Sequence, residues 1–308
     1  MRKTLTVLAV IVLIVAIVVG VGQWLGNPAG KDSNQAQPSD APAPAVEQPE
    51  WCPAIEVISV PATGESSIDD DPAAPSFNPN ALFTPLTSTL SQEFAPEDVK
   101  VWTTPYPAEI RTLQAPQLAT YDDSQRFGYE RTTAEMVAMN QDCPLTDFVM
   151  MGFSQGAAIA GNIAEQAGAG NGPVPAERIK GVALVGDPRR DPNQGQNPGQ
   201  PTAGVGLELA LGPFRDIAAQ IVPGATMRGS RTGFGVLNDR VQNICAGGDT
   251  FCDAPPALPD LIARAQEMFA MAGVHASYGT NPNVIPGTTA VAWIDGWTRG
   301  FINEALNS

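Results

Sequence analysis

Short apolar segments that do not alternate with polar residues constrain the fold of this chain most strongly. Strands of this kind must be buried on both faces, as in a parallel sheet covered by helices. Stretches with helical periodicity separate them, for example residues 79–94 with Leu82, Leu86 and Leu90 on one face. We therefore predict an α/β fold, a three-layer α/β/α sandwich with a central, mainly parallel sheet. The expected strands are Ala54–Val60, Val99–Thr103, Asp147–Gly152, Ile179–Val185 and Val241–Ile244, and the expected helices are Pro79–Phe94, Tyr129–Gln141, Gln155–Ala167 and Ala290–Asn307.

The N-terminal segment, residues 1–25, predicts export. Arg2 and Lys3 precede an apolar run, Leu5–Leu25, which as a helix would span about 30 Å, close to the thickness of a bilayer core. The run is either a cleaved signal peptide or an uncleaved signal anchor with its positive end inside. We favour the anchor because the run is long and no A-x-A cleavage site follows it directly. The folded part is then extracytoplasmic, either secreted or attached to the cell membrane and envelope.

Composition defines the remaining domains and excludes one class of partner. Residues 26–50 are rich in Pro, Ala, Ser and Gln and predict a flexible linker, so that the folded domain comprises residues 51–308. The formal net charge of -15 argues against nucleic acid as a partner, because phosphate binding needs clustered Lys and Arg. We expect the domain to be a monomer.

The cysteine count agrees with export. The chain has four cysteines and one histidine, which favours two disulfides over a metal site. Three pairings are possible, and we favour Cys52–Cys143 with Cys245–Cys252.

The sequence Gly152-Phe153-Ser154-Gln155-Gly156 is a G-x-S-x-G motif between an apolar strand and a small-residue helix. A sharp turn at this junction strains the backbone of Ser154 and exposes its hydroxyl at the helix N-terminus, where a developing anion is stabilised. The motif therefore predicts a nucleophilic serine, although a glycine-rich turn with a chance serine has the same letters.

A nucleophilic serine needs a base and an acid. His275 is the only histidine and follows Ser154 in the chain. We favour Asp249 as the acid because it lies within the Cys245–Cys252 loop, where a covalent constraint would hold it. Asp187 follows a strand closely and is the second choice, although an Asp before Pro188 is typical of a turn. The aspartates between the nucleophile and the base are Asp187, Asp191, Asp216, Asp239, Asp249, Asp253 and Asp260.

The tetrahedral intermediate of such a reaction needs two N–H donors. We expect one from the backbone of Gln155 and one from the loop after the first strand, near Thr63, whose hydroxyl can also contribute.

Together these residues resemble the cutinase family over most of residues 51–308. The resemblance rests on GFSQGA at 152–157, C-x-x-G-D-x-x-C at 245–252, HASYG at 275–279, and Cys52 followed by a strand and an ATGE turn. It implies a single-domain α/β-hydrolase that hydrolyses carboxylic esters and lacks the large lid of true lipases.

The resemblance also implies roles for individual residues. Asp249 and His275 complete a triad with Ser154, and Thr63 contributes to the oxyanion hole. The family's two disulfides match the pairing that we favour.

Three features differ from fungal cutinases: the N-terminal anchor and linker, the long segment 187–234, and a helix expected at Leu258–Met271. In these respects the chain is similar to cutinase-like proteins of mycolic-acid-bearing actinobacteria, which act on lipid esters. The added apolar helices are then either a wall for a long acyl chain or surface decoration.

We therefore predict an extracytoplasmic serine esterase that acts on lipid or acyl esters without a cofactor or metal. The same residues would suit a phospholipase, a thioesterase or an envelope-lipid acyltransferase. A non-catalytic envelope scaffold is the alternative from another class, and the presence of all three triad residues argues against it.

Overall fold

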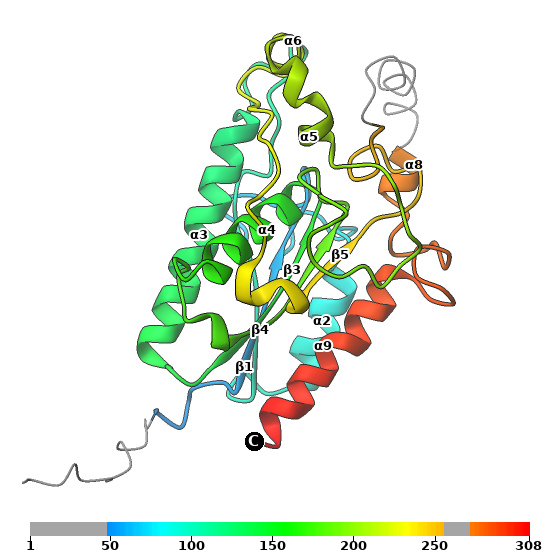
Figure 1. Ribbon diagram of the computed structural model, residues 1–308. Coiled ribbons are helices and arrows are strands. Elements are labelled where there is room, and N and C mark those ends of the chain that lie inside the picture. Colours follow the sequence, from blue (N-terminus) through cyan, green and yellow to red (C-terminus); the bar gives the residue numbers. More distant parts are fainter. Residues whose placement is uncertain (1–47, 256–271) are drawn as a thin grey trace, which may run out of the picture. The chain divides into compact units, whose positions relative to one another are not determined.

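The computed structural model describes residues 48–255 and 272–308 (Figure 1). The predicted anchor or signal peptide at 1–25, most of the predicted linker and the helix expected at Leu258–Met271 lie outside these ranges. Within them, none of the helices combines the length and apolar character needed to cross a bilayer. Membrane attachment through residues 1–25 therefore stays a prediction.

A five-stranded parallel sheet forms the centre of the domain, with strand order β2-β1-β3-β4-β5. Because all strands run in one direction, the loops after their C-terminal ends gather at one edge, where active sites of open α/β sheets are found. Ser154, Gly186 and Cys245 directly follow β3, β4 and β5 at this edge. The strands are β1 (Ile55–Val60), β2 (Val99–Thr103), β3 (Asp147–Phe153), β4 (Ile179–Val185) and β5 (Val241–Ile244).

Helices cover both faces of the sheet, so the predicted three-layer architecture is confirmed (Figure 1). Residues on β1 alternate between the two layers: Ile55 and Val57 pack with α2 and α9, and Ile58 and Val60 pack with α3 and α4. All four are fully buried, which explains why this strand has no polar period. The long helices are α2 (Thr84–Glu93), α3 (Tyr121–Asp142), α4 (Gln155–Gly168) and α9 (Ala290–Leu306), and the short ones are α5 (Leu207–Leu211), α6 (Arg215–Ile221) and α8 (Ala272–His275), with 3₁₀ turns at Ala176–Arg178, Gly212–Phe214 and Gly235–Arg240.

Two helix starts differ from prediction for local reasons. Helix α3 begins at Tyr121 rather than Tyr129, because the Thr120 hydroxyl caps it by accepting from the Asp123 amide at 3.0 Å. Helix α2 begins at Thr84 rather than Pro79, because residues 78–81 form a turn closed by hydrogen bonds to Asn78. In both cases a polar capping or turn residue, and not the apolar period, sets the boundary.

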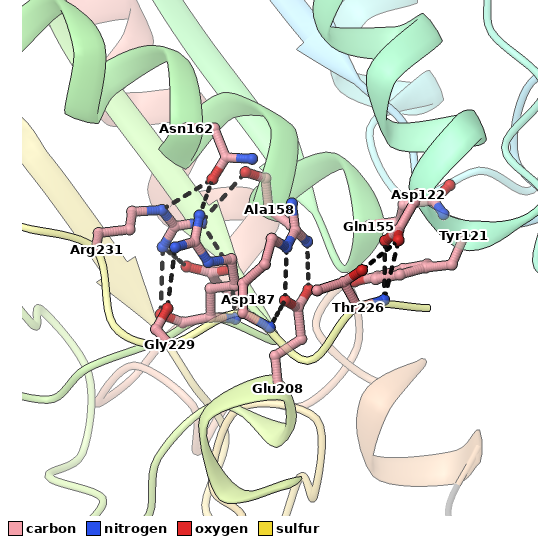
Figure 2. Close-up of polar contacts among 12 residues, drawn as sticks. Tyr121, Asp122, Gln155, Ala158, Asn162, Asp187, Glu208, Thr226, Gly229 and Arg231 are labelled. Atoms are coloured by element: carbon pink, nitrogen blue, oxygen red, sulfur yellow. Dashed lines mark hydrogen bonds and ion pairs between the residues drawn. The ribbon is translucent and has the colours of Figure 1, made fainter. Parts of the chain in front are cut away.

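A buried ion pair joins the ends of segment 187–234. Asp187 is fully buried, and Nη1 of Arg231 lies 2.6 Å from its Oδ2. Arg231 also donates to the Ala158 carbonyl and to Asn162 Oδ1, both on α4 (Figure 2). The segment is thereby fastened to the helix that begins after Ser154.

A second cluster fastens the middle of the segment to α3. Glu208 on α5 accepts hydrogen bonds from Arg228 Nε at 2.8 Å and from the Tyr121 hydroxyl at 2.9 Å. Beside it, the amide and hydroxyl of Thr226 donate to the Asp122 carboxylate (Figure 2). The segment that carries α5 and α6 is therefore bound to the domain at several points.

The structure contains both disulfides of the favoured pairing. Cys52–Cys143 joins the start of β1 to the end of α3, with a Cα–Cα distance of 5.5 Å. Cys245–Cys252 closes a short loop after β5, with a Cα–Cα distance of 5.9 Å. The second loop carries Asp249.

Candidate active site

Ser154 occupies the sharp turn between β3 and α4. Its φ and ψ of 53° and -115° lie where a non-glycine residue is rarely found, and only Ala108 shares a positive φ among the described non-glycine residues. The Ser154 amide donates to the Val185 carbonyl at 2.8 Å, which fixes the turn to β4. Such strain persists where the surrounding structure imposes it, commonly at an active site.

The glycines of the motif are required by backbone contacts. A Cβ added to Gly152 would lie 2.4 Å from the carbonyl oxygen of Gly156, and one added to Gly156 would lie 2.0 Å from that of Val60. Both distances are far below van der Waals contact. The absence of these Cβ atoms lets α4 begin directly against the end of β1.

Asp249 and His275 form a hydrogen-bonded pair. Nδ1 of His275 lies 2.8 Å from Oδ2 of Asp249, which is almost completely buried. The other carboxylate oxygen accepts the Phe251 amide at 3.0 Å. Asp249 therefore lies where it can hold the imidazole orientation and stabilise its charged form. His275 ends the short helix α8.

Two aromatic rings contact the imidazole. The His275 ring packs against Phe251, with centroids 4.2 Å apart, and against Phe153, with centroids 4.9 Å apart. Phe153 directly precedes Ser154 in the chain. Nε2 of His275, the nitrogen not used by Asp249, is buried and has no hydrogen-bond partner among the described residues.

Gly186, the first residue after β4, lies close to the imidazole of His275. Its φ is +61°, and an added Cβ would lie 2.9 Å from Cε1 of His275 and 3.4 Å from Oδ2 of Asp249. The preceding residue, Val185, accepts the Ser154 amide. Gly186 thus lets the His275–Asp249 pair pack closely against the end of β4, next to the carbonyl that accepts the Ser154 amide. The sequence analysis missed this role.

The turn at residues 62–65 lies next to the start of α4. Gly156 packs against Val60, and Thr63 is exposed just beyond it. The Gly64 amide donates to the Ala108 carbonyl at 2.7 Å, which fixes the turn. The Gln155 amide belongs to the first turn of α4, where N–H groups have no partner within the helix. The two expected oxyanion donors therefore come from adjacent backbone segments.

Glu65 holds this turn in place. Its carboxylate accepts the amides of Ala62 and Leu82, each at 2.9 Å. Burial raises the pKa of Glu65, and the two backbone hydrogen bonds and the nearby His275 oppose that rise. The Glu65 carboxylate on this turn thus interacts electrostatically with His275.

The Gln155 side chain is occupied elsewhere. Its Oε1 accepts from the Ser124 hydroxyl at 3.1 Å, and its Nε2 donates to the Glu109 carbonyl at 3.2 Å. Only the Gln155 backbone is then free for an oxyanion.

The structure shows the partners of Asp187, the second choice for the acid, and of Tyr278, which the sequence analysis gave no role. Asp187 is paired with Arg231 and therefore has a cation as its partner. Tyr278 was quoted only as a letter of the HASYG block, yet its hydroxyl donates to Asp249 at 2.6 Å. Neither contact has a local sequence signal, because 44 and 29 residues separate the partners. In the part of the chain that the structure describes, no group of three or more His, Cys, Asp or Glu side chains is arranged to hold a metal ion.

Two comparisons, one with a family model and one with a curated relative, identify the family of this chain. The family model described as Cutinase matches residues 78–281. The chain is 44% identical to the carboxylesterase Culp6 homologue of Corynebacterium glutamicum, over 99% of this chain and all of that protein. Among solved structures, the catalytic core of acetyl xylan esterase from Trichoderma reesei covers 73% of this chain and 98% of its own (18% identity, TM-score 0.43). A cutinase-like protein from Cryptococcus sp. covers 75% of this chain and 97% of its own (18% identity, TM-score 0.42).

Proposed function

This chain belongs to the cutinase family and is a carboxylic ester hydrolase, and we propose that it cleaves lipid or acyl esters outside the cytoplasm through an acyl-enzyme on Ser154. The proposed triad is Ser154, His275 and Asp249. The observation that carries it is the strained Ser154 turn, because Phe153, which precedes the serine, and Gly186, which follows the acceptor of the Ser154 amide, lie against the His275–Asp249 pair.

The reaction proceeds in two acyl-transfer steps. His275 Nε2 takes the Ser154 proton as Oγ attacks the ester carbonyl, and the amides of Gln155 and Thr63 stabilise the oxyanion. The imidazolium, stabilised by Asp249, then protonates the leaving alcohol as the ester C–O bond breaks. Water, deprotonated by His275, attacks the acyl-enzyme and releases the acid and Ser154.

The apolar part of segment 187–234 supports a lipid substrate. The Leu207 amide at the start of α5 donates to the Phe251 carbonyl at 2.9 Å, and the Phe251 ring packs against His275 at a tilt. On the following helix α6, Ile217 and Ile221 are 58% and 59% exposed. An acyl chain that leaves the active site along α5 would reach these side chains, so we assign them to acyl-chain contact.

The proposed attachment and location rest on the sequence of residues 1–25. A basic start followed by an apolar run long enough for a bilayer supports an anchor, with the hydrolase domain on the outer side. The two disulfides are consistent with an oxidising compartment.

The direct test is hydrolysis of p-nitrophenyl esters from C2 to C16 by the full-length chain. Ser154→Ala and His275→Ala should each abolish turnover on all chain lengths while the thermal transition stays intact. An active Ser154→Ala protein would refute the assigned nucleophile.

The lipid specificity has its own test. Replacing Ile217 and Ile221 by Ser should lower kcat/KM for long chains and leave C2 hydrolysis unchanged. Val236→Ser is the matched control, because Val236 is 73% exposed in the 3₁₀ turn that packs near the far end of α4. Equal effects of both changes on long chains would argue against an acyl contact on α6.

A further inference from the structure

Tyr278 lies behind the Asp249–His275 pair, completely buried. Its hydroxyl is 2.6 Å from Oδ2 of Asp249, 3.1 Å from the amide nitrogen of Ala246 and 3.3 Å from Sγ of Cys252. Three positions of the loop closed by Cys245–Cys252 therefore converge on one hydroxyl group.

The direction of each hydrogen bond follows from the donors available. The Ala246 amide can only donate, so it uses a lone pair of the hydroxyl. The disulfide-bonded Cys252 carries no proton to give. Burial, and next the Asp249 charge, raise the pKa of Tyr278 well above its usual value, so the phenol keeps its proton. That proton is therefore directed to Asp249.

The acceptor is the same carboxylate oxygen that His275 uses. Oδ2 receives both the Tyr278 hydroxyl and Nδ1 of His275, whereas Oδ1 receives the Phe251 amide. A second donor on Oδ2 limits rotation of the carboxylate. It also withdraws part of the negative charge that would otherwise act on the imidazole.

The ring of Tyr278 reaches the nucleophile side as well. It packs edge-on against Phe153, with centroids 5.8 Å apart, and edge-on to His275, at 6.2 Å. The backbone carbonyl of Tyr278 accepts the Ala290 amide at the start of α9. Tyr278 is thus fixed by a long helix, and its hydroxyl is not free to move.

We propose that Tyr278 is a positioning residue of this esterase, which orients Asp249 for His275 and moderates the charge that Asp249 presents to it. The proposal rests on the proposed triad. Tyr278 itself touches neither the substrate nor the serine hydroxyl.

Two effects are expected when the hydroxyl is removed. In Tyr278→Phe the ring packing stays, but Asp249 loses one of the two hydrogen bonds that orient its carboxylate for His275. The value of kcat/KM for p-nitrophenyl acetate should therefore fall about 10- to 100-fold. Oδ2 then presents more charge to the imidazole and stabilises its protonated form. The acidic limb of the pH–kcat/KM profile should therefore move to higher pH.

Other charged groups near the pair are unchanged in this variant. Glu65 on the turn at residues 62–65 acts on His275, and Arg190 on segment 187–234 acts on Tyr278. Asp253, directly after the disulfide loop, accepts the Gly248 amide and acts on Arg190. Their contributions cancel when the variant is compared with the parent chain.

The experiment measures full pH–rate profiles on the full-length chain. Tyr121→Phe is the matched control, because that buried tyrosine also donates to a carboxylate, Glu208, whose other hydrogen bonds come from Arg228 and not from His275. Its profile should keep the parent midpoint. Replacing Tyr278 by 3-fluorotyrosine, a stronger donor that keeps the ring and hydroxyl, should move the acidic limb to lower pH even if Tyr278→Phe folds poorly.

The two proposals fail differently. If the parent chain hydrolyses the ester, Ser154→Ala does not, and neither change at Tyr278 moves the acidic limb, the positioning role is wrong while the triad stands. If Ser154→Ala retains activity, the triad itself is wrong and the role of Tyr278 falls with it. Opposite shifts with phenylalanine and 3-fluorotyrosine would support the proposal.

Discussion

Asp187 and Asp249 follow neighbouring strands at the same edge of the sheet, and their partners differ in kind. Asp187 is fully buried against Arg231, a guanidinium that offers only N–H donors. Asp249 instead faces His275, an imidazole with one nitrogen that can donate and another that can accept a proton. A carboxylate paired with a permanent cation fastens a segment, whereas one paired with an imidazole can support proton transfer.

The most direct test of the separate roles of Asp187 and Asp249 is to neutralise each carboxylate in turn. Asp249→Asn should reduce kcat by about 10⁴-fold, because a neutral amide no longer stabilises the imidazolium and favours the wrong tautomer. Asp187→Asn should lower the free energy of unfolding but leave kcat of the folded protein within about tenfold of the parent value. This change is far smaller than the loss expected for Asp249→Asn. Both are measured with p-nitrophenyl acetate, corrected for folded fraction by circular dichroism. Equal losses of kcat would show that the two aspartates do not have separate roles.

The stability role of the Asp187–Arg231 pair predicts the next largest effect. Arg231→Met leaves a fully buried carboxylate without its cation and should lower the free energy of unfolding by about 3–5 kcal/mol. The double variant Asp187→Leu/Arg231→Met should regain much of this loss, since it buries no unpaired charge. Urea denaturation of the three proteins measures both values. A double variant as unstable as the single one would mean that the charges are not coupled.

The covalent support of Asp249 predicts a smaller effect. Removing Cys245–Cys252, as Cys245→Ala/Cys252→Ala, should cost about 2.5 kcal/mol in the chain-entropy model and also lower kcat, because the loop carries Asp249. Cys52–Cys143 closes a longer loop, of 91 residues' separation, so its removal should cost more stability, with kcat unchanged because Asp249 lies outside that loop. If both double variants kept the parent kcat, the loop would not need its disulfide to position Asp249.

A third buried carboxylate extends the comparison to pH. Glu56 on β1 lies 3.2 Å from Lys100, which also pairs with Glu135. Burial raises the pKa of Glu56 to about 8 against the opposing charge of Lys100. Because this pKa is raised on folding, its contribution to stability is complete below the unfolded value near 4.5 and is lost as pH rises towards 8.

Glu56→Gln removes this titration. The difference in unfolding free energy between variant and parent should therefore move in favour of the variant by up to about 1.4 kcal/mol per pH unit between pH 5 and pH 8. Chemical denaturation at four pH values measures it. A difference independent of pH would show that Glu56 does not change protonation in this window.

Sequence patterns located the sheet well because most residues of its strands are buried. Ile179–Val185 and Val241–Ile244 have the predicted bounds. The start of α3 was missed because its first turn is polar, although Thr120 followed by Asp123 is a recognisable cap. A local apolar pattern thus predicts the bounds of an element only where apolar residues extend to its ends.

The candidate site divides in the same way. Ser154 and the loop of Asp249 have local motifs, so the sequence named them. Arg231 and Tyr278 act through partners 44 and 29 residues away. Contacts between residues so far apart in the chain depend on the order of the strands in the sheet. A local sequence pattern therefore cannot predict them.

Labelling with a fluorophosphonate tests the central assignment most directly. A serine is labelled at a useful rate only where a base activates it. The full-length chain is exposed to the reagent beside Asp249→Asn, and the adduct is located by peptide mass spectrometry. A single adduct on Ser154, formed far more slowly in Asp249→Asn, is the predicted result. An adduct on another residue, or equal rates in both proteins, would contradict the Ser154–His275–Asp249 triad.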